Sequence, residues 1–296
     1  MTSFSLEYYP PNVEADKTDL LEQAELMSFY KPVYMSITHS FNALDSNNTL
    51  DIAQRLSSRI NTSVVPHITC AKSSKETMIS MANDYSNIGI SSVVALRGDA
   101  NSEEYSQLDR YIDAKEFTQA LSDQFAFKIF TAGYPEGHPE SISQEADILY
   151  LKEKCIAGAD EIITQWFFNN EDFLKYRDNV NAFGIDKPIA AGILPISDFE
   201  KVKKFAKVCG AKIPQSLEKR FASVRENDDQ GIEELGQSIA IDQIENLKKE
   251  GVDNFHLYTL NRKQLTQDII HHFKKPINPQ TKHNNEGLLK NNRKAS

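Results

Sequence analysis

The sequence predicts an α/β protein built as a (β/α)8 TIM barrel. Eight short apolar runs alternate with amphipathic stretches along a chain of 296 residues. That length suits a single barrel, which commonly takes about 250 residues. A doubly wound open sheet is the competing topology, but none of the twelve glycines forms a GxGxxG run or a P-loop. Because the crossover between two parallel strands is right-handed, eight successive strand-helix units are expected to close into a parallel barrel.

The first half of the chain supplies four strand-helix units. The expected strands are 4–9, 33–37, 63–68 and 92–94. Apolar residues at helical spacing predict a helix over 20–28, a second that Asn48 or Thr49 caps and that reaches 60, and a third from Ser73 or Ser74 to Gly89. Pro66 makes the third strand atypical for a central position, because proline has no N–H to donate to a neighbour.

The second half repeats the alternation and ends in a polar tail. The expected strands are 127–132, 161–166, 189–193 and 254–258. Helices are expected over 113–124, 143–158, 169–184, 197–208, 215–225, 230–250 and 259–273. From 274 to 296 the chain is rich in Asn and Lys and poor in apolar residues, so we expect a disordered tail after a single barrel domain over 1–273.

Composition narrows the classes of partner. A formal charge of −9 argues against a general nucleic-acid binder. No apolar run approaches the ~20 residues that span a bilayer, and the N-terminus lacks a leader pattern, so we expect a cytoplasmic protein without a membrane partner. Cys70, Cys155 and Cys209 are widely spaced and indicate neither a disulfide framework nor a zinc site.

Polar residues gather where the predicted strands end, which is where barrel enzymes carry their active sites. These positions are Glu7, Thr38, His39, His67, Arg97, Gly98, Asp99, the loop 134–138, Gln165, 195–197 and 258–262. Three of them, Glu7, His67 and Gln165, lie within apolar patterns, where a polar side chain needs a partner or a function. The sequence therefore predicts a binding site at this end of the barrel.

Each of these residues also has a purely structural interpretation. Glu7, between Leu6 and two tyrosines, would be a partly desolvated carboxyl suited to a general acid, or it would pair with a barrel Lys or Arg. Arg97 and Asp99 would face a ligand, pair with each other or cap the next helix. A lone histidine such as His67 is more often structural than a ligand of a metal, and no metal motif is present.

The loop 134–138 and the pair Asp147 and Lys154 indicate a ligand site only when they are taken together with the residues above. The Pro- and Gly-rich loop 134–138 would present Tyr134 and His138 rigidly. Asp147 and Lys154, seven residues apart, share one face of the following helix, although such a face is usually solvated. Aromatic residues near the mouth, Phe205 among them, pack by default but can stack on a planar ligand.

Seven segments together resemble the motifs of the 5,10-methylenetetrahydrofolate reductase family. They are LEYYPP (6–11), PHITC (66–70), ALRGD (95–99), YPEGHP (134–139), ITQWFF (163–168), GILPI (192–196) and FHLYTLNR (255–262). The resemblance spans about residues 3–273, in the family's order, and its length is that of the bacterial type of catalytic barrel.

The resemblance implies a flavoprotein of one-carbon metabolism. It implies FAD across the top of the barrel, NADH or NADPH as reductant, and ping-pong hydride transfer that converts 5,10-methylenetetrahydrofolate to 5-methyltetrahydrofolate for methionine synthesis. It also implies a homo-oligomer. The sequence does not choose between the two nicotinamides, because no ribose-reading motif is present.

The resemblance also implies roles for individual residues. Glu7 matches the catalytic acid that assists opening of the folate ring to an iminium cation, and Asp99 matches a carboxylate near both flavin and pterin. Gln165, Phe205 and Arg262 match folate contacts. The flavin contacts are matched by Thr38, His67, Arg97, Gly98, Asp99, Tyr134, His138, Asp147 and Lys154.

The chain departs from the family pattern in places that concern FAD. The run from His39 to Asn42 replaces a tyrosine and glycine-rich run, and Lys201 replaces a common glutamine. Tyr150 and Glu153 replace Asn and Arg, and a glutamate beside a pyrophosphate would weaken anion binding. Two alternatives follow: the same barrel with weak or lost FAD and direct hydride transfer from the nicotinamide, or a non-catalytic folate-binding subunit.

Overall fold

Eight parallel strands close into a barrel in chain order, as the alternation predicted. The computed structural model describes residues 2–39, 46–98, 108–225 and 228–277. Within them the strands are β1 (Ser3–Tyr8), β2 (Tyr34–Ile37), β3 (Ser63–Thr69), β4 (Ser92–Leu96), β5 (Lys128–Gly133), β6 (Glu161–Thr164), β7 (Ile189–Ile193) and β8 (Asn254–Tyr258). Pairing of Leu6 with Leu257 and of Glu7 with Tyr258 joins β1 to β8 and closes the ring.

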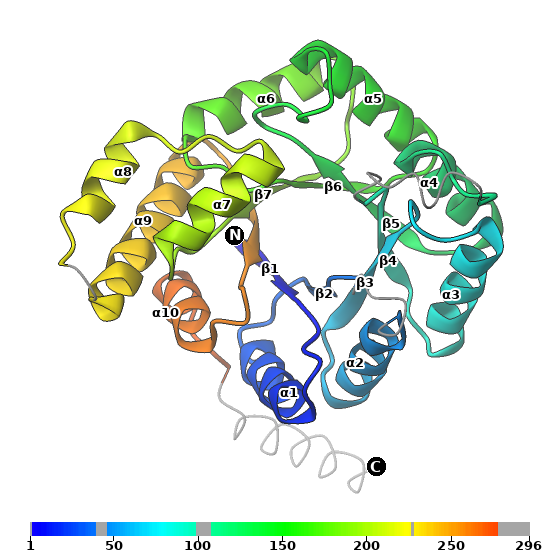
Figure 1. Cartoon of the computed structure of the whole chain (residues 1–296), viewed down its shortest axis with the longest axis horizontal. Helices are drawn as coiled ribbons and strands as arrows, with labels where there is room; N and C mark the ends of the chain where they lie inside the picture. Colours follow the sequence, from blue (N-terminus) through cyan, green and yellow to red (C-terminus); the bar gives the residue numbers. More distant parts are fainter. Residues whose placement is uncertain (1, 40–45, 99–107, 226–227, 278–296) are drawn as a thin grey trace, which may run out of the picture.

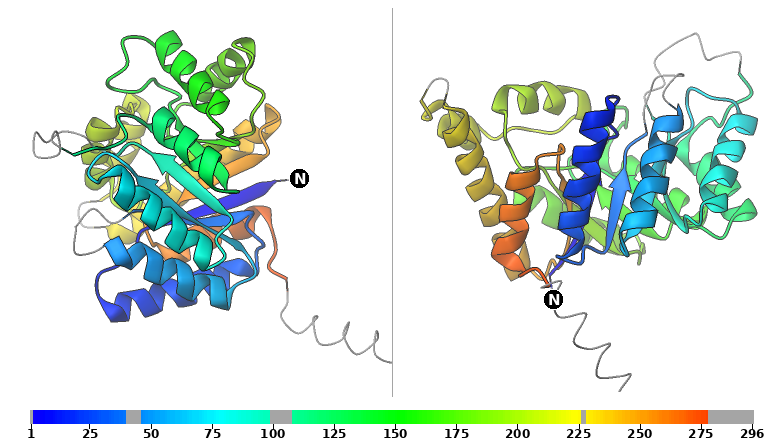
Figure 2. Two further views of the ribbon diagram at one scale, coloured as in Figure 1. Left: turned by 90° about the vertical axis from the view of Figure 1, so that its right-hand side faces the viewer. Right: turned by 90° about the horizontal axis from the view of Figure 1, so that it is seen from below.

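Helices surround the strands on the outside (Figures 1 and 2). They are α1 (Glu14–Ser28), α2 (Ser46–Arg59), α3 (Lys75–Asn87), α4 (Ala114–Gln124), α5 (Gln144–Ile156), α6 (Asn170–Ala182), α7 (Phe199–Cys209), α8 (Gln215–Ala222), α9 (Asp229–Lys249) and α10 (Lys263–Phe273). The unit between β7 and β8 holds three helices, α7, α8 and α9, which share an apolar cluster around Phe199, Val202 and Phe221. The predicted TIM barrel is thus confirmed.

Short polar side chains start several helices where the sequence placed them. Ser74, Ser143 and Asn169 each accept a hydrogen bond from a main-chain N–H of the first turn. The predicted cap of α7 is wrong by one residue, because Asp198 and not Ser197 accepts from the N–H of Lys201.

Two other predicted helix starts are wrong. α2 already begins at Ser46, so Asn48 lies inside the helix and donates its side-chain amide to Pro11 O at 2.9 Å. The last helix begins at Lys263 and not at 259, because Leu260 and Asn261 both adopt positive φ, of 47° and 54°, which no α-helix contains.

Pro66 lies inside β3, a strand that pairs with a neighbour on each side, as is unusual for proline. β3 pairs with β2 up to Ile37 and Pro66, and with β4 only from His67 onward. Pro66 therefore lies where the pairing changes from one neighbour to the other, so its missing N–H is tolerated within a closed sheet.

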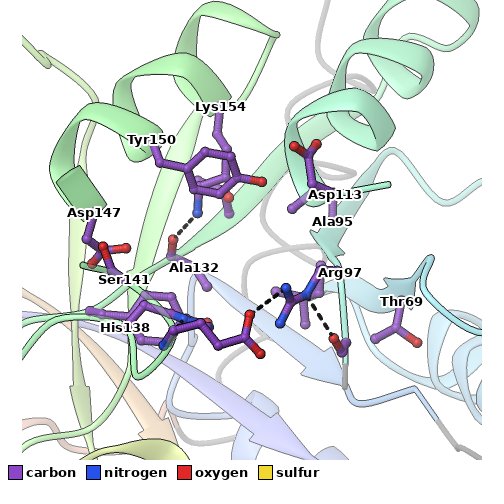
Figure 3. A pocket seen from close by; sticks show the side chains of 16 residues that line it. Thr69, Ala95, Arg97, Asp113, Ala132, His138, Ser141, Asp147, Tyr150 and Lys154 are labelled. Carbon is purple, nitrogen blue, oxygen red and sulfur yellow. Dashed lines mark hydrogen bonds and ion pairs between the residues drawn. The ribbon is translucent and has the colours of Figure 1, made fainter. Parts of the chain in front are cut away.

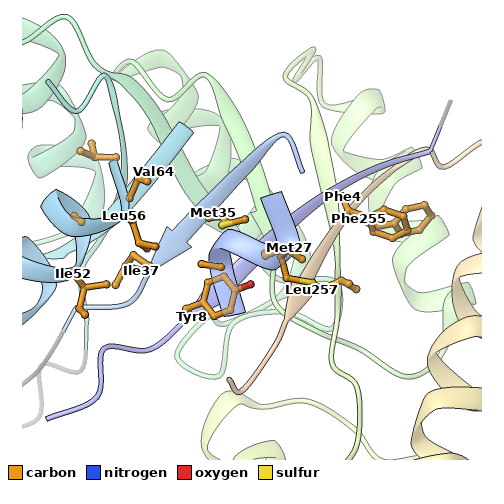
Figure 4. Close-up of a cluster of buried hydrophobic side chains, with 14 of the residues drawn as sticks. Phe4, Tyr8, Met27, Met35, Ile37, Ile52, Leu56, Val64, Phe255 and Leu257 are labelled. Carbon is orange, nitrogen blue, oxygen red and sulfur yellow. The ribbon is translucent and has the colours of Figure 1, made fainter. Parts of the chain in front are cut away.

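The main core fills the space between the strands and the outer helices. Figure 4 shows Phe4, Met35 and Leu257 from the sheet packed with Met27 of α1, and Ile52 and Leu56 of α2 lie nearby. A smaller apolar cluster inside the barrel contains Tyr34, Val65, Val94, Phe130 and Ile163. This inner cluster supports the carboxyl end of the barrel from below.

The chain leaves the barrel at the end opposite its mouth. Ile277 donates its main-chain N–H to Phe29 O at 2.9 Å, and Lys274 Nζ donates to Lys31 O at 3.0 Å. The rest of the predicted tail, 278–296, lies outside the described residues. No helix in the described ranges combines the length and the apolar character that crossing a membrane requires.

Candidate active site

Glu7 lies at the carboxyl end of β1 between two histidines. Its Oε2 is 3.5 Å from Nε2 of His67 on β3 and 3.5 Å from Nε2 of His256 on β8. Only 17% of the Glu7 side chain is exposed. No Lys or Arg of the described residues pairs with this carboxylate. Glu7 therefore does not form the barrel ion pair to Lys or Arg that was the structural alternative.

The two histidines are buried and differently held. Burial lowers the pKa of His67 to about 4, so this imidazole is neutral at pH 7. The Nδ1 atom of His256 is 2.8 Å from Ser5 Oγ, and the ring of Tyr34 stacks on the same imidazole at 5.8 Å. Their Nε2 atoms have no hydrogen-bond partner among the described residues, so the Glu7 carboxylate is the polar group that faces both.

A cavity of about 490 Å³ opens between β4, β5, α4 and α5. Figure 3 shows Arg97, which directly follows β4, on one side of the cavity and Tyr150 and Lys154 of α5 on the other. Six of the residues predicted to contact the flavin line this cavity: Arg97, Gly98, Tyr134, His138, Asp147 and Lys154. The structure thus brings together two segments, 97–98 and 147–154, that the sequence could not place relative to one another.

Lys154 and Asp147 lie on one face of α5. From the sequence, this face would ordinarily be solvated. Both are buried, and Lys154 Nζ donates to Ala132 O at 2.6 Å. Burial lowers the pKa of Lys154 to about 8, while nearby Asp147 opposes the shift. Burial also raises the pKa of Asp147 and lowers that of His138, whose Nδ1 accepts from the N–H of Glu140 at 3.1 Å.

Arg97 has a partner that the sequence did not suggest. Its Nη1 lies 2.7 Å from Oε2 of Glu140 in the loop after β5, and this hydrogen bond raises the pKa of Arg97. Gly98 follows with φ of 79°, and a Cβ there would lie 3.0 Å from Cβ of Thr69. Asp99, predicted as a catalytic and flavin-binding carboxylate, lies outside the described residues.

The remaining predicted residues occupy other parts of the barrel mouth. Thr38 follows β2, and its carbonyl accepts from Thr49 Oγ1 at 3.1 Å. Gln165 follows β6 and accepts from its neighbour's N–H at 3.1 Å. Phe205 of α7 is 45% exposed, and Arg262 is exposed at the start of α10. None of these four side chains lines the 490 Å³ cavity.

The departures from the family pattern fall in separate places. Tyr150 lines the cavity, and its Oη accepts from the N–H of Lys115 at 3.3 Å. Glu153 instead pairs with Lys115 Nζ at 3.1 Å and lines a different groove between α4 and α5. Glu153 therefore does not line the 490 Å³ cavity, and its expected effect on anion binding stays a prediction.

His39 and Lys201, the other departures that are described, have partners in the structure. The Nδ1 of His39 accepts from the N–H of Thr69 at 3.1 Å, which ties the end of β2 to β3. Lys201 pairs with Asp198 at 3.2 Å. Residues 40–42 lie outside the described part of the chain.

Sequence reasoning missed His256 as a site residue. The signal was present, because Asn254, His256 and Tyr258 alternate with the buried residues Phe255 and Leu257. Period-two alternation in a barrel strand places one set inside the barrel and the other against the helices. Thr69, Asp113 and Ser141 also line the cavity, but no pattern in the sequence distinguished them from ordinary loop residues.

Comparisons with known proteins agree with these motifs. The family model described as methylenetetrahydrofolate reductase matches residues 1–274. The 5,10-methylenetetrahydrofolate reductase of Pectobacterium carotovorum is 38% identical over 267 residues, covering 90% of this chain and 88% of that protein. The enzyme of Escherichia coli, with the same name, is 36% identical and covers 90% and 89%.

Solved structures share the fold at low identity. An uncharacterized protein from Clostridium thermocellum that binds two copies of 5-methyl-5,6,7,8-tetrahydrofolic acid has a TM-score of 0.58 and 15% identity, over 92% of this chain and 96% of that one. Dihydropteroate synthase from Xanthomonas albilineans has a TM-score of 0.52 and 9% identity, covering 92% and 91%. These likenesses concern the barrel fold alone.

Proposed function

The chain belongs to the methylenetetrahydrofolate reductase family, and we propose that it reduces 5,10-methylenetetrahydrofolate to 5-methyltetrahydrofolate with NADH or NADPH by a ping-pong reaction through FAD. The observation that carries the proposal is the nearly buried Glu7 carboxyl, held between two imidazoles at the barrel mouth. The product would supply methyl groups for methionine synthesis. We also propose a cytoplasmic homo-oligomer, as the family resemblance implies.

The residues around the 490 Å³ cavity fit a dinucleotide such as FAD. The ammonium of Lys154 has three N–H donors, of which one goes to Ala132 O, and it lies buried where a pyrophosphate would complete its partners. Asp147 and Ser141 offer acceptors for sugar hydroxyls. When bound, FAD supplies a two-electron carrier that accepts hydride from the nicotinamide and passes it to the folate.

Glu7 would act as the proton donor to the folate. The pKa of His67 of about 4 leaves this imidazole, 3.5 Å from the Glu7 carboxyl group, neutral at pH 7. As the proposed general acid, Glu7 would give a proton to the ring nitrogen that must leave the methylene carbon. Partial burial keeps bulk water away from this proton during the transfer.

Three residues of the mouth support a folate site beside Glu7. Phe205 presents an exposed ring that can stack on a planar ligand. Gln165 has both a donor and an acceptor for the edge of a pterin. The exposed guanidinium of Arg262 suits the carboxylates of a glutamate tail.

An absorption spectrum of the purified protein, followed by anaerobic addition of NADH or NADPH and then of methylenetetrahydrofolate, tests the proposal. We expect bound flavin, its bleaching by a nicotinamide and its reoxidation by the folate. A colourless protein that still reduces the folate would indicate direct hydride transfer. A protein that binds folate without turnover would be a non-catalytic binding subunit, and either result would overturn the flavin mechanism.

A further inference from the structure

We propose that Asn261 is a positioning residue that fixes the strand end bearing Glu7; this inference rests on the proposed function. The side-chain amide of Asn261 bonds both main-chain polar groups of Tyr9, two residues beyond Glu7. The N–H of Tyr9 donates to Asn261 Oδ1 at 3.2 Å, and Asn261 Nδ2 donates to Tyr9 O at 2.9 Å. We call this pair of bonds the Asn261 clamp.

The clamp continues the pairing of β1 with β8 beyond the point where the strands end. Thr259 donates both its N–H and its Oγ1 hydrogen to Glu7 O, at 3.2 Å and 2.6 Å. The same Oγ1 accepts from the N–H of Asn261 at 3.1 Å. The main chain from the carbonyl of Glu7 to Tyr9 is therefore held by two residues of the segment after β8, Thr259 and Asn261.

The backbone at Leu260 and Asn261, between β8 and α10, adopts a strained conformation that positions the clamp. Leu260 and Asn261 both have positive φ, and leucine gains nothing from that conformation by itself. The bend turns the amide of Asn261 towards Tyr9 and brings Arg262 to the start of α10. One strained turn thus sets the position of the proposed acid and of the proposed folate-binding arginine.

The position of the Glu7 carboxyl group depends on the backbone, because the side chain itself makes only long contacts. The two contacts of Oε2, at 3.5 Å each, leave Nε2 of both histidines without a hydrogen bond among the described residues. The direction of the carboxyl group is then set mainly by the end of β1. A small shift of a catalytic group can slow a reaction by about 100-fold, so loosening this segment would affect proton transfer before it affects folding.

The test compares Asn261→Gly with Asn48→Ala. Glycine adopts positive φ without strain, so this variant removes the clamp but not the bend. Asn48→Ala removes the hydrogen bonds that the Asn48 side-chain amide donates to the same segment, at Pro10 O, Pro11 O and Asn12 Oδ1, and it leaves the bonds of Tyr9 in place. Asn261→Asp retains the acceptor for the N–H of Tyr9 but loses the donor to Tyr9 O, and we expect it to be intermediate.

Stopped-flow absorbance measures the two half-reactions of each variant. For Asn261→Gly we expect oxidation of the reduced protein by methylenetetrahydrofolate to slow by about tenfold or more, while reduction by the nicotinamide stays within about twofold. Asn48→Ala should leave both within about twofold of the unaltered protein. Equal slowing of both half-reactions by Asn261→Gly, no slowing, or equal slowing of the folate step by Asn48→Ala would overturn the inference.

Hydrogen exchange of the peptide covering 6–12 tests the clamp without reference to catalysis. We expect faster exchange there in Asn261→Gly, with β5 unchanged as an internal control. Exchange equal to that of the unaltered protein would overturn the clamp. If the unaltered protein fails to reduce the folate, the proposed function fails, and this exchange result still decides whether the clamp exists.

Discussion

Glu7 is partly buried and has two histidine neighbours. Replacing it with glutamine tests its role as a proton donor without changing how the side chain packs. Glutamine keeps the size of the side chain but has no acidic proton. We expect Glu7→Gln to abolish reduction of the folate and to leave reduction of the flavin by the nicotinamide largely intact. Rapid-mixing measurements of the separate half-reactions check this, and comparable loss of both would count against Glu7 as the acid.

His67 should make stability depend on pH. Its pKa of about 4 in the folded protein lies below the ordinary 6.5, so the unfolded chain binds a proton first as pH falls. The stabilisation is complete above pH 6.5 and is lost between about 6.5 and 4, which amounts to about 2 kcal/mol between pH 7 and 5.

Urea unfolding of His67→Gln at pH 7 and pH 5 tests this dependence. We expect its loss of unfolding free energy on acidification to be smaller than in the unaltered protein by about 2 kcal/mol. An unchanged pH dependence in His67→Gln would show that other groups cause the acid sensitivity.

At the scale of elements, α5 supplies the buried cation of the cavity. Because the pKa of Lys154 is lowered to about 8, its charge should disappear as pH rises through that value. We expect the dissociation constant for FAD to rise by up to about tenfold per pH unit above 8, and Lys154→Arg to remove this dependence because arginine stays charged. Flavin fluorescence titrations between pH 7 and 9.5 measure it.

Lys152→Arg is the matched control for this prediction. Lys152 lies on the same helix, but its Nζ donates to Phe183 O at 2.8 Å, and it does not line the cavity. The variant should retain the pH dependence of the unaltered protein. If Lys154→Arg also retains it, the pyrophosphate does not bind at this ammonium.

At the scale of the whole molecule, the barrel and its first residues beyond α10 should suffice for the fold. We propose 1–273 as the catalytic domain, with 274–277 anchored beneath it by the bonds to Lys31 O and Phe29 O. A chain ending at 277 should melt within about 1 °C of the full chain. Ending at 273 should lower Tm by a few degrees, since each lost bond contributes about 1 kcal/mol.

Thermal unfolding followed by circular dichroism, with the flavin content of each chain as a second measurement, checks this division. A large loss of stability in the chain ending at 277 would show that 278–296 contributes to the folded domain. Equal melting of all three chains would show that the anchor beneath the barrel is energetically negligible.

The sequence by itself determined the order of elements and the end of the barrel that carries the site. Period-two runs and helical spacing depend on local physics, so strands such as 189–193 and caps such as Ser74 and Ser143 were predictable. The motifs also indicated the family, which the comparisons confirm. The roles assigned to individual site residues stay predictions.

Only the tertiary structure decided which polar residues meet and which are buried. Lys154 looked like part of a solvated face, but the neighbouring β5 strand covers it and lowers its pKa. Glu140 pairs with Arg97, and His256 lies against Glu7, across sequence separations that no local pattern encodes. Burial and charge pairing depend on elements brought together by barrel closure, so only the closed barrel fixes them.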